Sequence, residues 1–278
     1  MNGGQRAWRD TQNGGSPALL LASWLLGGLL LAFILLPLIQ LLTAQSGATM
    51  LRVAGEIDVR DALALSIGAS FLTAVVAGAF GVPLAYLLAR SGFRGKGIVA
   101  AIVDIPLTVP HTVAGIALLM VFGRHGVVGE PLENLLGLRF WGTLAGIVVA
   151  MLFVSAPYAV NAARIGFEGV DPRIEMVART LGMGPLQALA RVTLPLAWRG
   201  IATGLTLTFA RSISEFGAVV ILVYYPMTAP VKIYDMFLNY GLQDASAAAA
   251  LLLLVSLALF ILFRHLAYGR RPIAGSGR

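Results

Sequence analysis

The amino-acid sequence predicts an all-α, polytopic membrane protein with about six transmembrane helices and a cytoplasmic loop of short helices. Hydrophobic residues make up 58% of the 278 residues and charged residues 12%, against roughly 25% charged residues in a soluble domain. Several apolar runs exceed about 18 residues, the length that crosses a bilayer. A polar, arginine-bearing segment at 171–195 separates two of these runs, and a simple membrane anchor needs no such segment.

The apolar runs define the expected spans in chain order, at 18–42, 61–89, 98–122, 140–164, 199–224 and 244–264. Arg6 and Arg9 precede the first run, as basic residues precede the apolar region of a signal peptide. The run of about 25 apolar residues is, however, too long for the apolar region of a signal peptide. We therefore expect an uncleaved first helix. One membrane domain at 18–265 is expected between cytoplasmic tails at 1–17 and 266–278.

The third run is interrupted by polar and helix-breaking residues, namely Asp104, Pro106, Pro110 and His111. Proline removes a backbone hydrogen bond, which is tolerated where neighbours or water satisfy the freed carbonyl. The interruption indicates either a packing kink or the border of a pathway. Asp104 would repel an anion, so we expect it to pair with a basic residue or to lie near the cytoplasmic end, close to Lys96.

Lysine and arginine are distributed unevenly between alternate loops. With the N-terminus inside, the inner segments hold 14 of them and the outer segments 5, while Arg211 lies within the fifth run. Cytoplasmic loops carry this excess, so both termini and the loop at 165–198 are expected in the cytoplasm. The net charge of +7 then reflects topology, because the basic residues form no stripe suited to nucleic acid.

Within the polar segment, local signals predict two short helices joined at a glycine. Asp171 and Pro172 are typical of an N-cap and a first helical position, and Gly182 is placed to end the helix in a left-handed conformation. An apolar stripe at helical spacing is expected on its inner face, formed by Ile174, Val177, Ala178 and Leu181. The second helix is expected at 185–192, ended by Pro195, with a buried side of Leu186, Leu189 and Ala190.

The same segment resembles the signature loop of ABC-importer permeases, written as EAA, three residues, Gly, nine residues, Ile, one residue and Leu-Pro. Five positions match it, with valine for isoleucine: Ala178, Gly182, Val192, Leu194 and Pro195. Met176 stands where the family has Glu and Val177 where it has the first Ala. Glu175 comes one residue early, a rotation of about 100° on a helix.

The resemblance implies a coupling-helix loop at about 167–198 that docks into a groove on an ATPase subunit. Its contact residues would be Glu175, Ala178, Gly182, Val192, Leu194 and Pro195. Two permease copies would then be moved by two ATPases. The chain itself has no GxxxxGK[ST] phosphate loop, so the partner would use the ATP and no cofactor is expected here.

The fifth run carries polar residues at helical spacing. Thr208, Arg211 and Glu215 follow Gly204 on one face, with Ser212 beside them and Ser214 near the edge. A charge near mid-membrane is costly and faces a bundle interior or a wet cavity. Arg211 and Glu215 could form an ion pair that packs helices. Alternatively, the stripe lines a translocation path between two protomers, where Arg211 offsets the repulsion of an anion. Both interpretations can hold together.

Two further runs, RSISEFGA at 211–218 and YPMTAP at 225–230, resemble the permeases of molybdate, tungstate and sulfate importers. The resemblance covers about 60–265 and is greatest for the molybdate/tungstate branch, with a sulfate/thiosulfate permease as the alternative. It implies a tetrahedral oxyanion delivered by an external binding protein, a homodimer in membrane lipid, and the prokaryotic cytoplasmic membrane.

Other function classes are less well supported. Cysteine is absent, and His111, His125 and His265 lack metal-ligand spacing, so a satisfied or solvent-facing role is expected for each. A membrane-embedded enzyme would have to use Asp104 with His111, or Glu215, but no catalytic motif accompanies them. A channel or secondary transporter would need no docking loop.

Overall fold

The computed structural model describes residues 17–268, whose regular elements are all helices and which contain no strand. Four helices are long and apolar enough to cross a membrane: α2 (Pro17–Thr43), α4 (Ile57–Arg90), α8 (Leu144–Glu168) and α14 (Leu242–Tyr268). A bent pair, α5 (Lys96–Thr108) and α6 (His111–Phe122), makes a fifth candidate span. The predicted all-α membrane fold is confirmed, although the spans are less regular than expected.

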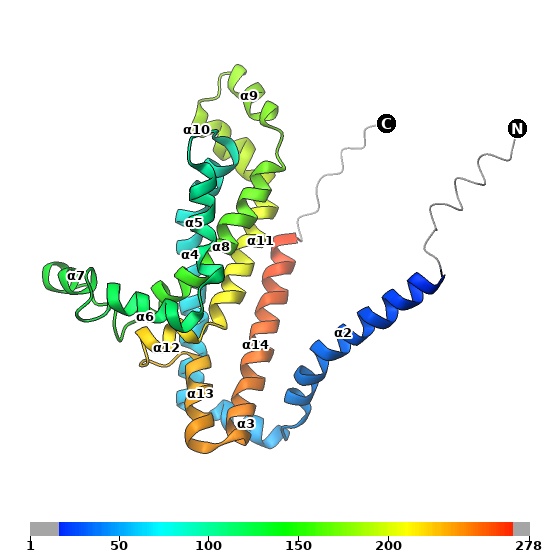
Figure 1. The fold of residues 1–278 in the computed structure, drawn as a ribbon, viewed down its shortest axis with the longest axis vertical. Coiled ribbons are helices and arrows are strands. Elements are labelled where there is room, and N and C mark those ends of the chain that lie inside the picture. The colour runs from blue at the N-terminus through cyan, green and yellow to red at the C-terminus, as the bar shows by residue number, and fades with distance from the viewer. Residues whose placement is uncertain (1–16, 269–278) are drawn as a thin grey trace, which may run out of the picture.

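The remaining helices are shorter and lie at the ends or flanks of the bundle, apart from the central α11 (Leu194–Ile213). They are α3 (Gly47–Gly55), α7 (Gly129–Leu136), α9 (Pro172–Thr180), α10 (Pro185–Ala188), a π-helix (Leu189–Thr193), α12 (Gly217–Leu222) and α13 (Ala229–Tyr240). In Figure 1, α9 and α10 lie at one end of the bundle and α3 and α13 at the other. The polar segment at 171–195 therefore lies at the end of the bundle opposite α3 and α13.

Helices α4, α8 and α11 pack against one another at the centre of the molecule, and α14 runs along α11 (Figure 1). Small residues allow this close approach: a Cβ added to Gly200 would lie 2.5 Å from the Cα of Gly166, and one added to Gly204 would lie 3.0 Å from the carbonyl oxygen of Ala159. Close backbone approach through small residues is a usual device of membrane helices.

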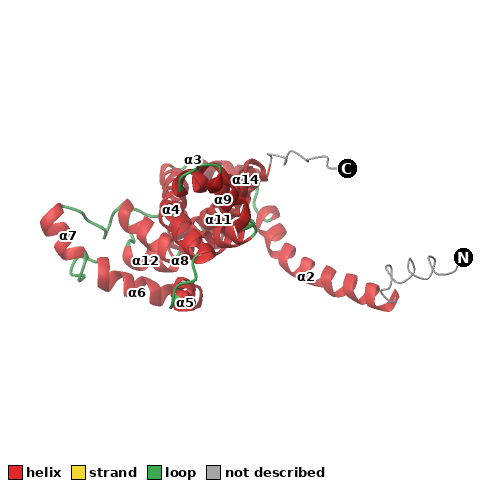
Figure 2. Cartoon of the chain, turned by 90° about the horizontal axis from the view of Figure 1, so that it is seen from above, coloured by secondary structure: helices red, strands yellow, loops and turns green. Residues whose placement is uncertain are grey.

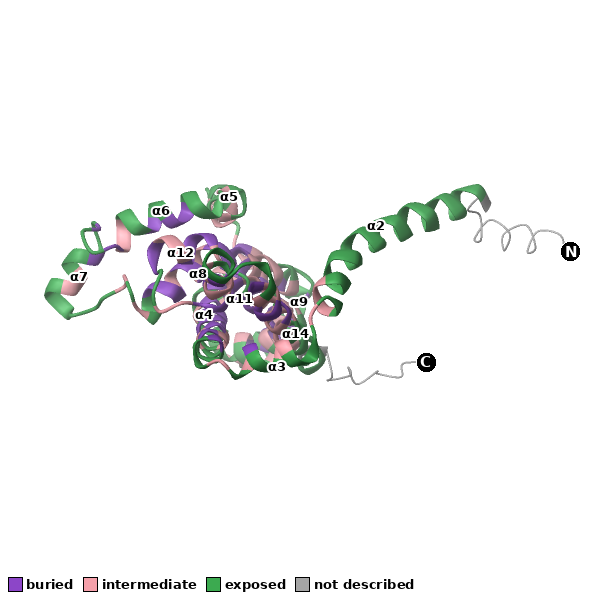
Figure 3. Ribbon diagram, turned by 90° about the horizontal axis from the view of Figure 1, so that it is seen from below, coloured by how far each residue is buried: buried purple, intermediate pink, exposed green. Residues whose placement is uncertain are grey.

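Helix α2 lies apart from this bundle. It extends away from one side of the bundle, while α6 and α7 extend from the other (Figure 2). None of the residues in its apolar window is buried, and Trp24 is 80% exposed, as the exposed colour along the helix shows (Figure 3). An apolar helix with so much exposed surface requires lipid or another protein around it.

Two of the six expected spans are not single helices. The run at 98–122 is divided at Val109, where α5 and α6 meet at 112°, because Pro110 disfavours a helical conformation of the preceding residue. The run at 199–224 begins earlier, as α11, and ends at Ile213 before a break at 214–216 and the short α12. The interruption predicted for the third run is therefore confirmed, whereas an unbroken fifth span was wrong.

The sequence did not reveal the short helices α3, α7 and α13, which have too few apolar residues to resemble spans. Most of the expected tails is not described by the structure. Residues 1–16 and 269–278 lie outside the described residues, and α14 continues to Tyr268, beyond the boundary expected at 265.

Candidate functional site

The polar segment forms the short-helix loop that local signals predicted. The Asp171 carboxylate accepts a hydrogen bond from the backbone N–H of Arg173, 2.9 Å away, and Pro172 occupies the first turn of α9. Gly182 has φ +91°, so the predicted left-handed turn is confirmed. The Met183 N–H donates to the Ala178 carbonyl oxygen at 3.2 Å, which closes the end of α9.

The apolar stripe of α9 lies mostly in the open, contrary to the expectation of an inner face. Ala178 is only 6% exposed, but Ile174, Val177 and Leu181 are 45%, 56% and 79% exposed. Leu186 on α10 is 79% exposed as well. We call Ile174, Val177, Leu181 and Leu186 the apolar loop surface. Exposed apolar residues gathered in this way are typical of a protein-binding surface.

The second short helix also differs from the prediction. Helix α10 has a single turn, after which a π-helix leads directly into α11, so Pro195 lies in the first turn of α11 and does not end a helix. Proline is accepted there because its missing N–H is needed least at the start of a helix. The buried residue of α10 is Ala188, not the predicted Leu186. Of the expected docking residues, Val192 and Leu194 are half-buried and Pro195 is exposed.

The Glu175 carboxylate is bonded within the protein. Its Oε1 accepts a hydrogen bond from the Tyr86 hydroxyl at 2.8 Å, and its Oε2 accepts one from the Thr193 hydroxyl at 2.9 Å. Arg90 Nε lies 3.9 Å from Oε2, and the side chains of Arg90 and Glu175 are 13% and 14% exposed. The expected ATPase contact of Glu175 has no support in this geometry. No local signal marked Tyr86, Arg90 or Thr193, because they are distant in sequence.

A second polar cluster lies at the break between α11 and α12. Arg211 Nη2 lies 2.8 Å from Glu215 Oε2 and 2.8 Å from Nε2 of His111. The Glu215 side chain is 2% exposed, and its Oε1 accepts the Ala218 N–H at 2.9 Å. This bond satisfies a donor at the start of α12. Glu215 therefore both neutralises Arg211 and stabilises the helix break.

His111 was not predicted to join this cluster. It begins α6, which packs on α12 so closely that a Cβ added to Gly217 would lie 2.7 Å from the Cβ of His111. The imidazole and guanidinium remain partly accessible, with side-chain exposures of 47% for His111 and 22% for Arg211. A signal did exist in the sequence, since Pro110 and His111 mark the helix break that brings the ring here.

Thr208 and Ser212 face α8 and not the accessible side of α11. Both are fully buried. The Ser212 hydroxyl donates to Ser155 Oγ at 2.9 Å, and the Thr208 hydroxyl donates to the Ser155 carbonyl oxygen at 3.3 Å. The predicted single stripe was wrong for these two residues, because the turn of α11 that carries them packs on α8. Ser214 is exposed and lies within 3.5 Å of Arg211 Nη1.

Asp104 has no basic partner among the described residues. Its Oδ1 accepts a hydrogen bond from Asn161 Nδ2 at 2.6 Å, which joins α5 to α8. Of the two alternatives expected for Asp104, the basic partner is therefore wrong, and a position near the cytoplasmic end, close to Lys96, stays a prediction.

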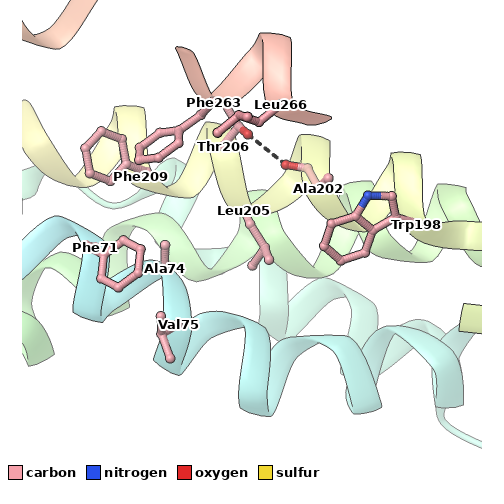
Figure 4. A pocket seen from close by; sticks show the side chains of 10 residues that line it. All are labelled: Phe71, Ala74, Val75, Trp198, Ala202, Leu205, Thr206, Phe209, Phe263 and Leu266. Atoms are coloured by element: carbon pink, nitrogen blue, oxygen red, sulfur yellow. Dashed lines mark hydrogen bonds between the residues drawn. The ribbon is translucent and has the colours of Figure 1, made fainter. Parts of the chain in front are cut away.

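A groove between α4, α11 and α14 has a volume of about 230 Å³ (Figure 4). None of its lining side chains is charged, and the Thr206 hydroxyl already donates to the Ala202 carbonyl oxygen at 2.8 Å. The groove offers nothing to an oxyanion, because burying an unpaired anion against apolar walls is strongly unfavourable. The accessible polar cluster at Arg211 is the better candidate for contact with an anion.

Comparison with known proteins gives concordant matches. The family model described as a binding-protein-dependent transport system inner membrane component matches residues 81–271. The chain is 41% identical over 243 residues to the molybdate/tungstate transport system permease protein WtpB of Pyrococcus abyssi, covering 87% of this chain and 92% of that protein. It is 37% identical over 203 residues to the molybdenum transport system permease protein ModB of Escherichia coli, covering 72% and 87%.

The fold is similar to that of a chain in a crystal structure of a bacterial ABC transporter involved in the import of the acidic polysaccharide alginate. The TM-score is 0.74 at 18% sequence identity, over 96% of this chain and 100% of the other. At this identity the likeness concerns the fold alone.

Proposed function

The chain belongs to the family of binding-protein-dependent transport system inner membrane components, and on that premise we propose that it is the permease subunit of an ATP-driven oxyanion importer. It is an integral membrane protein. Two copies would enclose a path, two cytoplasmic ATPases would drive it, and an external binding protein would deliver the anion. Both termini and the loop of α9 and α10 would face the cytoplasm, as the excess of basic residues indicates.

The observation that best supports this proposal is the apolar loop surface. It lies at one end of the bundle, on the two short helices that the left-handed turn at Gly182 joins. Its residues are exposed, and on the proposed cytoplasmic side apolar area facing water is unfavourable unless a partner covers it. Ala178 is buried beneath the surface and Gly182 sets the angle between the helices. The proposed contact with the ATPase is therefore made by Ile174, Val177, Leu181 and Leu186, with Val192, Leu194 and Pro195 at its continuation into α11.

Molybdate or tungstate is the cargo that relatives favour, since the Pyrococcus abyssi relative is named a molybdate/tungstate permease and the Escherichia coli relative a molybdenum permease. The Arg211 cluster has suitable chemistry for a brief contact. Its arginine can attract a dianion, while the bonded Glu215 limits the net positive charge and so prevents tight retention. Weak binding is what a conducting path requires. The proposed path residues are Arg211 of α11 and Ser214 of the break that follows it, with His111 added from α6.

The test is uptake of labelled anions into proteoliposomes that hold the chain, its ATPase and its binding protein. We expect ATP-dependent uptake of molybdate and tungstate, with sulfate at least about tenfold slower. Rapid uptake of sulfate alone would identify the sulfate/thiosulfate alternative. Absence of uptake for all three anions would contradict the oxyanion assignment, and turnover of a substrate by the chain alone would favour the membrane-enzyme class.

A further inference from the structure

Glu175 joins three separate segments of the chain: α9, which carries it, α4 through Tyr86, and the π-helix through Thr193. We propose that Tyr86 and Thr193 are positioning residues that hold Glu175, so that movement of α9 is transmitted to α4 and α11 together. The inference rests on the proposed function, because it concerns how the docked loop transmits movement. It assigns Glu175 an internal role, in place of a contact with the ATPase.

The covalent route from α9 to α11 contains two points at which movement can be absorbed. One is the left-handed elbow at Gly182, whose missing Cβ leaves the backbone unrestricted. The other is the π-helix at Leu189–Thr193, a rare and wide helical turn of a kind that is frequent at functional sites. With these two flexible points in the connection, a movement of α9 would reach α11 only weakly through the backbone.

The Glu175 carboxylate connects α9 to the end of the π-helix, beyond both of these flexible points. Thr193 is the last residue of the π-helix and is fully buried, so its hydroxyl at 2.9 Å connects α9 directly to the start of α11. Each carboxylate oxygen has its own hydroxyl donor. Hydrogen bonds to an ionised acceptor are shorter and about twice as strong as neutral ones, and the half-buried position of Glu175 limits competition from water.

The branch to α4 is reinforced by a second contact. Arg90 Nη2 donates to the Val170 carbonyl oxygen at 2.8 Å, in the link between α8 and α9, while its Nε faces Glu175 at 3.9 Å. That Nε is buried and has no hydrogen-bond acceptor, so the nearby carboxylate compensates its charge. Tyr86 also packs edge-on against Phe167 of α8, with ring centroids 5.4 Å apart. The base of α9 is thus fixed to α4 on both sides.

The experiment uses the complete transporter in proteoliposomes and measures anions imported per ATP hydrolysed. Thr193→Val keeps the shape of the side chain and removes the hydroxyl, and Tyr86→Phe does the same on α4. We expect ATP hydrolysis to continue in both, with import per ATP reduced about tenfold in Thr193→Val, the scale of a lost hydrogen bond to a charged group. Thr193→Ser restores the hydroxyl and should restore the ratio.

Matched controls separate positioning from a general loss of structure. Thr206→Val removes an α11 hydroxyl that bonds only within its own helix, to Ala202, and Tyr240→Phe removes the hydroxyl of a tyrosine residue that is 69% exposed. Both should keep the wild-type ratio. If Thr193→Val and Tyr86→Phe also keep it, the inference is overturned while the proposed function stands. If the wild-type complex imports nothing, the proposed function itself fails.

The cysteine-free sequence permits a second readout. Spin labels on cysteines introduced at Arg173, an exposed residue of α9 outside the apolar loop surface, and at Leu87 of α4, which is 45% exposed, report the distance between the loop and α4. We expect one narrow distance distribution, retained through the ATP cycle, in the wild type and a broader one in Thr193→Val/Tyr86→Phe. An equally narrow distribution in the double variant would contradict the positioning role, even if that variant imports poorly.

Discussion

His111 and Arg211 lie 100 residues apart in the sequence, yet Nε2 of the imidazole is 2.8 Å from Nη2 of the guanidinium. The contact joins the start of α6 to the end of α11, so two interrupted spans meet at one polar cluster. Discontinuous membrane helices commonly border a transport site. The pairing also shows why Arg211 is tolerated there, since Glu215 and His111 both face its charge.

Arg211→Gln should lower the initial rate of molybdate uptake about tenfold, because the path loses its cation while Ser214 remains. Loss of Arg211 also leaves Glu215 buried without its partner, which destabilises the protein independently of transport. The double variant Arg211→Gln/Glu215→Gln removes that unpaired charge. We expect it to recover the melting temperature of the purified protein without recovering uptake. Recovery of both would show that Arg211 serves packing only.

Gly182→Ala should reduce import per ATP hydrolysed while membrane insertion stays normal. A Cβ at Gly182 would meet no atom within 4 Å, so the effect comes from its φ of +91° alone, a conformation that costs an L-residue about 1–2 kcal/mol. Gly184→Ala is the matched control, because this glycine also has open space but an ordinary φ of −65°. Equal import per ATP in the two variants would argue against a role for the elbow.

Gly200→Ala should destabilise the bundle by about 1–3 kcal/mol, the usual cost of overpacking. Its new Cβ would lie 2.5 Å from Gly166 Cα and 2.9 Å from the Ala162 carbonyl oxygen, and these backbone atoms cannot move aside. Gly68→Ala on α4 is the control, since nothing lies within 4 Å there. Thermal unfolding in detergent should fall for Gly200→Ala and stay level or rise for Gly68→Ala; the reverse order would contradict the packing of α8 on α11.

Glu133 provides a pH-dependent test of the loop that contains α7. The indole N–H of Trp141 donates to Oε2 at 3.0 Å. This bond, together with the nearby Arg139, lowers the pKa of Glu133 below its ordinary value. A lowered pKa means that the ionised form stabilises the folded loop above the ordinary pKa, and that this contribution is lost as the pH falls through the folded value.

We therefore expect Trp141 fluorescence to remain constant near neutral pH and to change on acidification below about pH 4, since an ordinary glutamate titrates near 4.3. Glu133→Gln should abolish the transition, whereas Glu130→Gln on the same helix should retain it. In the Trp141→Phe variant the pH-dependent change in fluorescence should be absent, which assigns that change to Trp141. A transition at or above the ordinary glutamate range would contradict the lowered pKa.

The parts of the site that the sequence predicted are those set by near neighbours. Asp171, Pro172 and Gly182 act within one helical turn, so their roles follow from local chemistry. Hydropathy also located the membrane segments, because span length reflects bilayer thickness. The breaks at Pro110 and at 214–216 were harder to place, since only packing decides whether an interrupted run bends or divides.

The remainder depends on tertiary contacts. An apolar stripe on α9 predicts burial, but periodicity cannot distinguish the protein's own core from a partner, and Val177 and Leu181 proved to be exposed. Glu175 finds its donors 89 and 18 residues away, at Tyr86 and Thr193. A one-residue displacement within the signature motif gave no indication of these partners.

The central claim is that ATP hydrolysis by a partner moves an anion through this chain, and uptake with and without that partner tests it most directly. Proteoliposomes containing the chain, the ATPase and the binding protein should accumulate molybdate only when ATP reaches the ATPase. Vesicles that hold the chain alone should show neither ATP hydrolysis nor accumulation. Molybdate import by the chain alone, at the rate of the full complex, would contradict the account.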